Sequence, residues 1–136
     1  MTRITLLACA LAALALPAAA QTARKPDITK ELIGTWEGPY TSEAAPPGSL
    51  RLVVALGENQ EWKVTLDVIS DQAPPSGEVR NFTVDGNTVS WVQSVGDLEC
   101  SSNVTLVAGI LKGGAECLQN GALVLTAGFL LEKKKT

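Results

Sequence analysis

The stretch Glu61-Trp62-Lys63-Val64-Thr65-Leu66-Asp67-Val68-Ile69 decides the fold class of this 136-residue chain. Apolar and polar side chains alternate along it; the apolar set is Trp62, Val64, Leu66 and Val68, and the polar set is Lys63, Thr65 and Asp67. Successive side chains of an extended chain point to opposite faces, so the whole apolar set falls on one face. The stretch therefore predicts a β-strand that is buried on one side and solvated on the other.

The same alternation extends in both directions from this strand. Several of the alternating stretches are separated by turn sequences, and Asp85-Gly86-Asn87 and Asn120-Gly121 are typical of β-hairpins because glycine accepts the positive φ of such turns. Near the N-terminal side, residues 28–32 predict one helical turn after Asp27, a residue type that often caps helices. The predicted strands cover residues 34–41, 49–56, 61–69, 78–84, 88–94, 98–107, 110–118 and 122–132.

Eight strands joined mostly by short links predict an all-β fold, namely an up-and-down antiparallel eight-stranded barrel with a short N-terminal helical turn. Closure of the sheet removes exposed strand edges, and a barrel of this size is just wide enough for side chains or one small ligand. A β-sandwich is the alternative. Its Greek-key crossings need longer connections than most of those in this chain, so we prefer the barrel.

Two of the predicted links are rich in proline. Pro46 and Pro47 lie in the first link, and Pro74 and Pro75 lie in the third. Odd-numbered links of an up-and-down barrel all lie at one end, so both pairs would border the same opening. Because proline fixes φ and has no N–H to donate, these loops are either a rigid lip around a binding mouth or simple strand breakers.

Cys100 and Cys117 are expected to face each other across one hairpin. If Ala108-Gly109 is a two-residue turn, Val107 pairs with Ile110, and hydrogen-bonded and non-hydrogen-bonded pairs alternate outward from there. On that register the two cysteines form a non-hydrogen-bonded pair with Cα atoms about 4.5 Å apart, which is within the disulfide range. A metal or redox pair is disfavoured, because the chain has no His and no Cys-x-x-Cys.

The start of the chain matches the pattern of a secretory signal peptide. Arg3 precedes an apolar run that ends at Leu16, and Ala18-Ala19-Ala20 offers a small-residue cleavage site before Gln21. A membrane helix would need about 20 apolar residues, and Cys9 lies too early in the run for a lipoprotein signal. The predicted segments are a signal peptide over residues 1–20, a flexible tail over 21–27, a barrel domain over 28–132 and a basic tail over 133–136.

Three further stretches occur in a characteristic order. They are Gly34-Thr35-Trp36-Glu37-Gly38, then Phe82-Thr83-Val84-Asp85-Gly86-Asn87-Thr88-Val89-Ser90-Trp91, then Val104-Thr105-Leu106. This order resembles a bacterial secreted lipocalin-like (calycin-like) β-domain that is found alone or before α/β-hydrolase and peptidase domains. The resemblance implies that Trp36 packs across the closed end of the barrel, beneath the short N-terminal helix.

The chain departs from the calycin pattern in two places. Calycins often stack a cation from the last strand over the first-strand tryptophan, whereas Lys133 to Lys135 lie past the predicted end of the last strand. The hydrolase-linked domains usually carry another Gly-x-Trp where this chain has Gly114-Ala115-Glu116-Cys117. The predicted disulfide is expected to replace that packing.

The sequence shows no constellation that indicates catalysis. It has no His, which removes the commonest general base and the commonest transition-metal ligand. Its carboxylates show no spacing that singles out an acid–base pair, and a net charge of −3 offers no broad basic face for nucleic acid. We therefore predict a monomeric non-enzyme without metal, cofactor, nucleic-acid partner or membrane span after processing.

The remaining hypotheses concern binding. Four residues could line the barrel interior around an apolar ligand, although packed core is the alternative for all of them: Trp62, Leu66, Phe82 and Trp91. The first hypothesis is a periplasmic or secreted module that binds a small apolar ligand or a protein partner. The alternatives are a periplasmic protease inhibitor that acts through the tail 21–26, and a structural accessory domain of a hydrolase system.

Overall fold

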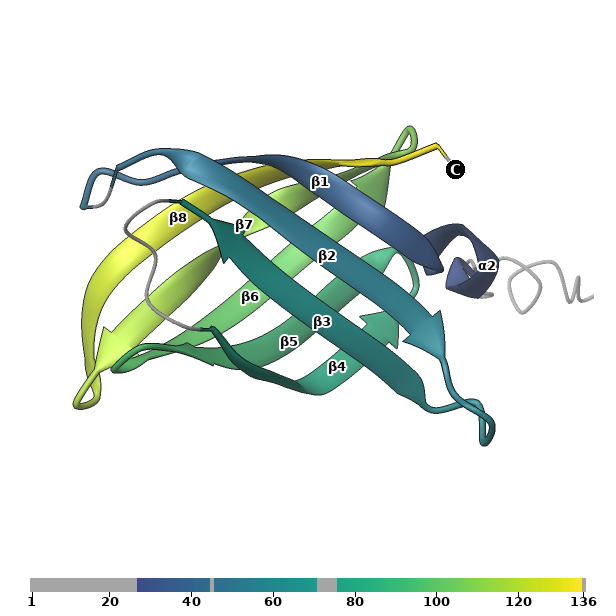
Figure 1. Ribbon diagram of the computed structural model, residues 1–136, viewed down its shortest axis with the longest axis horizontal. Coiled ribbons are helices and arrows are strands. Elements are labelled where there is room, and N and C mark those ends of the chain that lie inside the picture. The colour runs from purple at the N-terminus through teal and green to yellow at the C-terminus, as the bar shows by residue number, and fades with distance from the viewer. Residues whose placement is uncertain (1–26, 45, 71–75, 136) are drawn as a thin grey trace, which may run out of the picture.

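A computed structural model of the protein describes residues 27–44, 46–70 and 76–135. The predicted signal peptide, most of the predicted tail and the pair Pro74-Pro75 lie outside these residues. The described residues form one helical turn and eight strands (Figure 1). The elements are α2 (Thr29–Leu32), β1 (Gly34–Thr41), β2 (Gly48–Leu56), β3 (Trp62–Ile69), β4 (Ser76–Asp85), β5 (Thr88–Val95), β6 (Leu98–Val107), β7 (Ile110–Gln119) and β8 (Ala122–Lys133).

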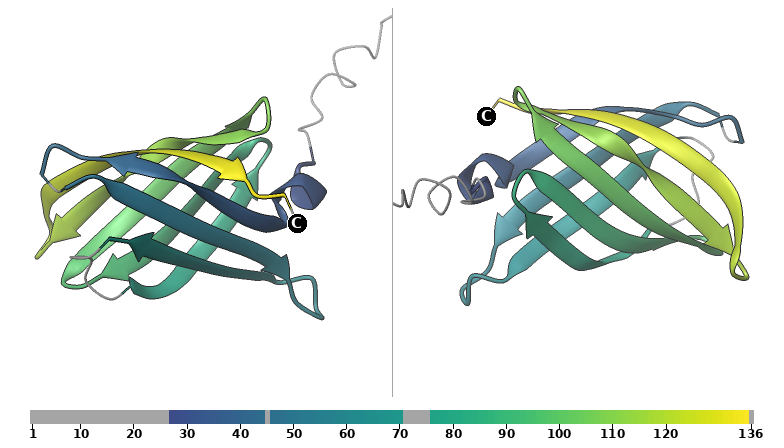
Figure 2. Two further views of the ribbon diagram at one scale, coloured as in Figure 1. Left: turned by 45° about the horizontal axis from the view of Figure 1, so that its top comes forward. Right: turned by 180° about the vertical axis from the view of Figure 1, so that it is seen from behind.

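The strands form one antiparallel, up-and-down sheet that curls into a nearly closed barrel (Figures 1 and 2). The strand order is β3-β2-β1-β8-β7-β6-β5-β4, so β1 pairs with β8 and the hydrogen-bonded ladder is open only between β3 and β4. The predicted all-β, eight-stranded barrel is confirmed over the sandwich. Each predicted element matches the observed one to within two residues, because alternation and turn residues act locally.

The hairpin between β6 and β7 has the predicted register. Val107 pairs with Ile110 around a turn in which Ala108 and Gly109 both have positive φ, 51° and 79°. Cys100 then pairs with Cys117, and the two form a disulfide with Cα atoms 4.0 Å apart. The turn dipeptide and the spacing of the cysteines were therefore sufficient to predict their pairing.

Helix α2 lies across one end of the barrel, which we call the closed end (Figure 1). Leu32 is fully buried there, and Trp36 of β1 is only 1% exposed. The indole Nε1 of Trp36 donates a hydrogen bond to the carbonyl of Leu32 at 2.9 Å. A one-turn helix cannot satisfy its own last carbonyls, so this bond and the burial of Leu32 hold the turn against the barrel.

The last strand differs from its predicted end in a way that matters for this region. β8 continues through Lys133, because Trp36 and Lys133 are still ladder partners where β1 and β8 pair. The Nζ of Lys133 lies 5.8 Å from the centroid of the Trp36 ring and donates to the carbonyl of Glu31 at 2.8 Å. Lys133 of β8 therefore supplies the cation over Trp36, although the sequence analysis placed it in the basic tail. The end of β8 lies beside α2 (Figure 2).

Candidate functional site

The other end of the barrel, which we call the mouth end, contains a cavity of about 250 Å³. Its rim includes Ser42 and Pro46 from the link between β1 and β2, and Ser70 directly after β3. The wall is formed by inward-facing residues of seven strands: Tyr40, Leu50, Leu66, Val68, Gln93, Val95, Leu98, Cys100, Ser102, Ala115, Cys117, Leu125, Ala127 and Phe129. The lining is mostly apolar, and none of these residues carries a charge.

The cavity exists because the inward side chains become smaller toward the mouth. On β7, the inward positions change from Leu111 near the closed end to Ala115 farther along. On β6 the same face changes from Val104 to Ser102, both buried. A barrel of eight strands is filled only when its inward side chains are large, so small ones leave space at this end.

The disulfide forms part of the cavity wall. Cys100 and Cys117 are 7% and 4% exposed, and both line the cavity. Because the sulfurs are bonded to each other, this part of the wall has no thiol nucleophile. The bond also ties β6 to β7 beside the cavity, where the neighbouring inward side chains are small.

Gln93 has two roles at this site. Its side chain is inside the barrel, 2% exposed, and its Nε2 donates to the carbonyls of Leu66 on β3 and Gly77 on β4, each at 2.9 Å. β3 and β4 do not pair with each other, so this one amide links the two strands across the open seam. Gln93 also lines the cavity, and its Oε1 accepts no hydrogen bond from any described residue.

The four residues predicted to line a ligand site are divided between two places. Leu66 lines the cavity. Trp62, Phe82 and Trp91 instead pack together across the seam, with ring centroids 5.3 Å apart for Trp62 and Phe82 and 6.1 Å apart for Phe82 and Trp91. Trp62 begins β3 and Phe82 lies near the end of β4, so both are at the closed-end side, away from the mouth.

Trp91 is a buried member of this aromatic cluster. It is 1% exposed, and its Nε1 has no hydrogen-bond partner among the described residues.

Of the predicted mouth prolines, Pro46 lines the cavity rim and Pro47 is exposed, while Pro74 and Pro75 lie outside the described residues. Among the described residues, the predicted lip is represented at the cavity by Pro46 of the first proline loop.

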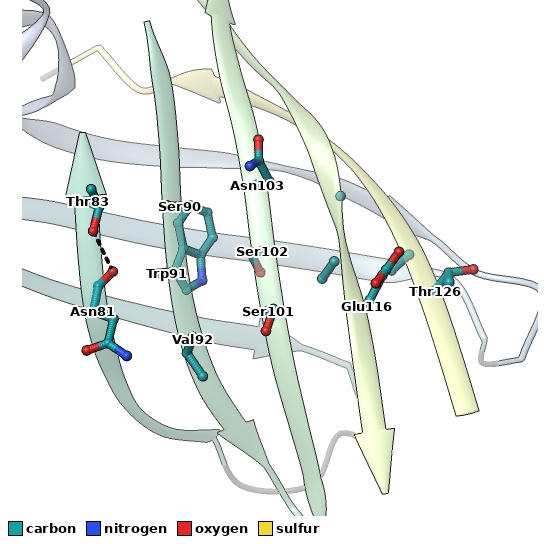
Figure 3. A pocket seen from close by; sticks show the side chains of 13 residues that line it. Asn81, Thr83, Ser90, Trp91, Val92, Ser101, Ser102, Asn103, Glu116 and Thr126 are labelled. Atoms are coloured by element: carbon teal, nitrogen blue, oxygen red, sulfur yellow. Dashed lines mark hydrogen bonds between the residues drawn. The ribbon is translucent and has the colours of Figure 1, made fainter. Parts of the chain in front are cut away.

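A second depression, of about 790 Å³, runs over the outer face of β4 to β8 (Figure 3). Short polar side chains line it, and those labelled in the figure include Asn81, Thr83, Ser90, Ser101, Asn103, Glu116 and Thr126. Asn81 has a φ of 55° at an irregularity in the pairing of β4 with β5. The sequence analysis did not predict this groove, although the outward Ser, Thr and Asn residues of these strands are visible in the alternation.

The ionisable groups with shifted pKa values lie outside the cavity. Hydrogen bonds lower the pKa of Glu37, and the one from Lys134 has the larger effect and the one from Arg51 the smaller. The Nζ of Lys134 lies 2.7 Å from one carboxylate oxygen of Glu37, and the Nε of Arg51 lies 2.6 Å from the other. A hydrogen bond from Thr29 lowers the pKa of Asp27. These carboxylates are kept ionised by their partners, which makes them structural charges of the closed-end region.

Neither the described residues nor the comparisons with known proteins assign a role to the site. Within the described residues, no group of three or more His, Cys, Asp or Glu side chains could hold a metal ion. None of the helices in that part of the chain is long and apolar enough to cross a membrane. Neither a protein-family model nor a curated protein sequence matches this chain.

Proposed function

We propose that this protein is a periplasmic or secreted, non-enzymatic module that holds a small apolar ligand in the cavity at its mouth end. The main support for the proposal is the difference in side-chain packing between the two ends of the barrel. The closed end is filled by large side chains, whereas the mouth end has an apolar cavity of about 250 Å³. Small-molecule sites are typically concave, mostly apolar and already formed before binding, with a few polar groups.

The size of the cavity limits the ligand. At about 30 Å³ for each water-sized group, it accommodates a chain of about eight heavy atoms. Transfer of such a chain from water would contribute about 0.8 kcal/mol per buried methylene. The disulfide and the ladder between β6 and β7 hold one wall in place, so binding would require little reorganisation.

The location rests on two features. The predicted signal peptide over residues 1–20 would direct export, although it lies outside the described residues. The disulfide between Cys100 and Cys117 supports this location, because such bonds form and persist in oxidising compartments.

The test is calorimetric titration of the purified barrel with 1-octanol, a neutral chain of suitable size. Ala127 lines the cavity, so Ala127→Leu would fill the space with an isopropyl group and should abolish binding. Thr126→Leu, which adds apolar bulk on the outward face of the same strand, is the matched control and should leave binding unchanged. Undetectable binding by the native protein, or equal binding by the Ala127→Leu variant, would refute the proposal.

A protein partner is the second candidate, and one observation favours it. The hairpin of β7 and β8 exposes Leu118, Leu123 and Val124 beside the mouth, with exposed fractions of 36%, 56% and 44%. Exposed apolar groups gathered at one place are typical of contact surfaces. Co-purification of native protein with and without Leu123→Ser would test this candidate. The inhibitor alternative remains a prediction, because residues 21–26 lie outside the described part of the chain. The accessory-domain alternative also remains a prediction, because no family model or curated protein matches the chain.

A further inference from the structure

We propose that the cavity selects an uncharged ligand whose polar end donates a hydrogen bond, with Gln93 and Ser102 as the residues that receive it. This inference rests on the proposed function and specifies the chemistry of the ligand's polar end. It rests on the polar residues that line the cavity and on the absence of charged residues from its described lining.

The first step concerns Gln93. Its Nε2 has two N–H groups, and both are used by the carbonyls of Leu66 and Gly77. These two bonds fix the orientation of the amide, because only the nitrogen can donate. The Oε1 is then left as an acceptor without a partner among the described residues, on a side chain that lines the cavity. A group that fits this atom must carry an O–H or N–H.

The second step concerns Ser102. Its side chain is buried, lines the cavity and has no hydrogen-bond partner among the described residues. Where β5 pairs with β6, Ser102 lies opposite Trp91 and Gln93 lies opposite Cys100. Gln93 and Ser102 are therefore diagonal neighbours on the inner face of the sheet. Such neighbours have Cα atoms about 7–8 Å apart, a span that one bridging hydroxyl group can close. Ser102 can both donate and accept, so it complements a ligand hydroxyl.

The third step concerns charge. Among the described residues, no Lys, Arg, Asp or Glu lines the cavity. A buried carboxylate or ammonium without a partner loses its hydration and gains no opposite charge in return. The cavity should therefore reject the charged forms of chains that it would accept as neutral molecules.

The experiment compares four chain molecules of similar length by calorimetry at pH 7.5: 1-octanol, 1-methoxyheptane, octanoate and octylammonium. The ether can accept but not donate, so it should bind about 2- to 10-fold more weakly than the alcohol, the factor for one net hydrogen bond. The two ions should bind at least about 100-fold more weakly than the alcohol.

A pair of variants assigns the effect to the cavity wall. Ser102→Ala should reduce the preference for the alcohol over the ether, whereas Ser101→Ala, the same change on the outward-facing neighbour, should preserve it. Thermal unfolding of both variants shows whether they remain folded. Equal affinity for alcohol and ether, or tighter binding of octanoate, would overturn the selectivity and leave the cavity a general apolar site. Failure of all four molecules to bind would overturn the proposed function itself.

Discussion

The two ends of the barrel use the same eight strands in different ways. At the closed end, Trp36 and Leu111 are almost fully buried, and Leu32 of α2 accepts a hydrogen bond from Trp36. At the mouth end, Ala115, Ser102 and Ala127 occupy inward positions on neighbouring strands and leave a cavity. The hydrogen-bonded ladders run through both ends, so the backbone does not create the difference. Side-chain volume along one face separates a packed core from a cavity.

The two ends of the barrel also differ in where covalent and polar restraints lie. The disulfide and the Gln93 amide both lie at the mouth end, where packing is thin. The closed end is held by packing, by the Trp36 bond to Leu32 and by Lys133. A cavity reduces the dispersion energy of its lining, so other restraints must keep its wall in one conformation.

The largest effect is expected at the closed end. Trp36→Ala should lower the free energy of unfolding by about 3–5 kcal/mol, because it empties a large buried site and removes the hydrogen bond to Leu32. Urea unfolding measures the change. Val124→Ala, on an exposed position of β8, is the control and should change stability by at most about 0.5 kcal/mol. An unchanged midpoint for Trp36→Ala would contradict the structural role of this end.

The next effect concerns the mouth. Replacing both Cys100 and Cys117 by Ala should reduce the unfolding free energy by about 3 kcal/mol, the chain-entropy value for a bridge of 17 residues' separation. Urea unfolding of the variant, and of native protein with and without reductant, gives two independent values. If reductant and substitution leave the midpoint unchanged, the disulfide does not stabilise this end.

A smaller effect is expected at the seam. Gln93→Leu should cost about 1–3 kcal/mol, because the carbonyls of Leu66 and Gly77 lose their donor. Amide hydrogen exchange should accelerate in β3 and β4 more than in β6 and β7, which remain paired and bridged. Gln119→Leu, at an exposed position on β7, is the matched control. Uniform acceleration in all strands would show that Gln93 does not act on the seam in particular.

The smallest effect is electrostatic and lies on the outside of the closed end. Lys134 and Arg51 lower the folded-state pKa of Glu37 below its ordinary value of 4.5, so the ionised carboxylate is favoured in the folded protein. Its stabilisation is therefore present above the unfolded-state pKa and lost as the pH falls through the folded-state pKa. The melting temperature of the native protein should exceed that of Glu37→Gln at pH 7, and the gap should close below pH 4.5. A gap that is constant with pH would contradict this.

Several features could be predicted from the sequence because they depend on near neighbours. Period-two alternation located the strands, and turn dipeptides located the hairpins. The register between β6 and β7 followed from the Ala108-Gly109 turn, so the cysteine pair followed as well. The role of Lys133 was missed, because the end of β8 depends on its pairing with β1, almost a hundred residues away in the chain.

The candidate site was predicted less well. Large aromatic residues on inward faces were equally compatible with a ligand wall and with a core, and the structure places Trp62, Phe82 and Trp91 in one packed cluster. The cavity is instead lined by apolar residues of mixed size, several small residues and a single glutamine. Gln93 shares the period-two face of Val89 and Trp91, so the alternation places it inward. Its role as a bridge between β3 and β4 has no sequence signature, because both acceptors are backbone carbonyls of other strands.

The strands, the turns and the pairing of the two cysteines follow from local sequence, because steric alternation and turn geometry act over a few residues. The tertiary structure added that the seam lies between β3 and β4 and that Gln93 spans it. It also decided which end of the barrel is hollow. That outcome depends on the combined volume of side chains from seven strands, which meet only when the sheet curls.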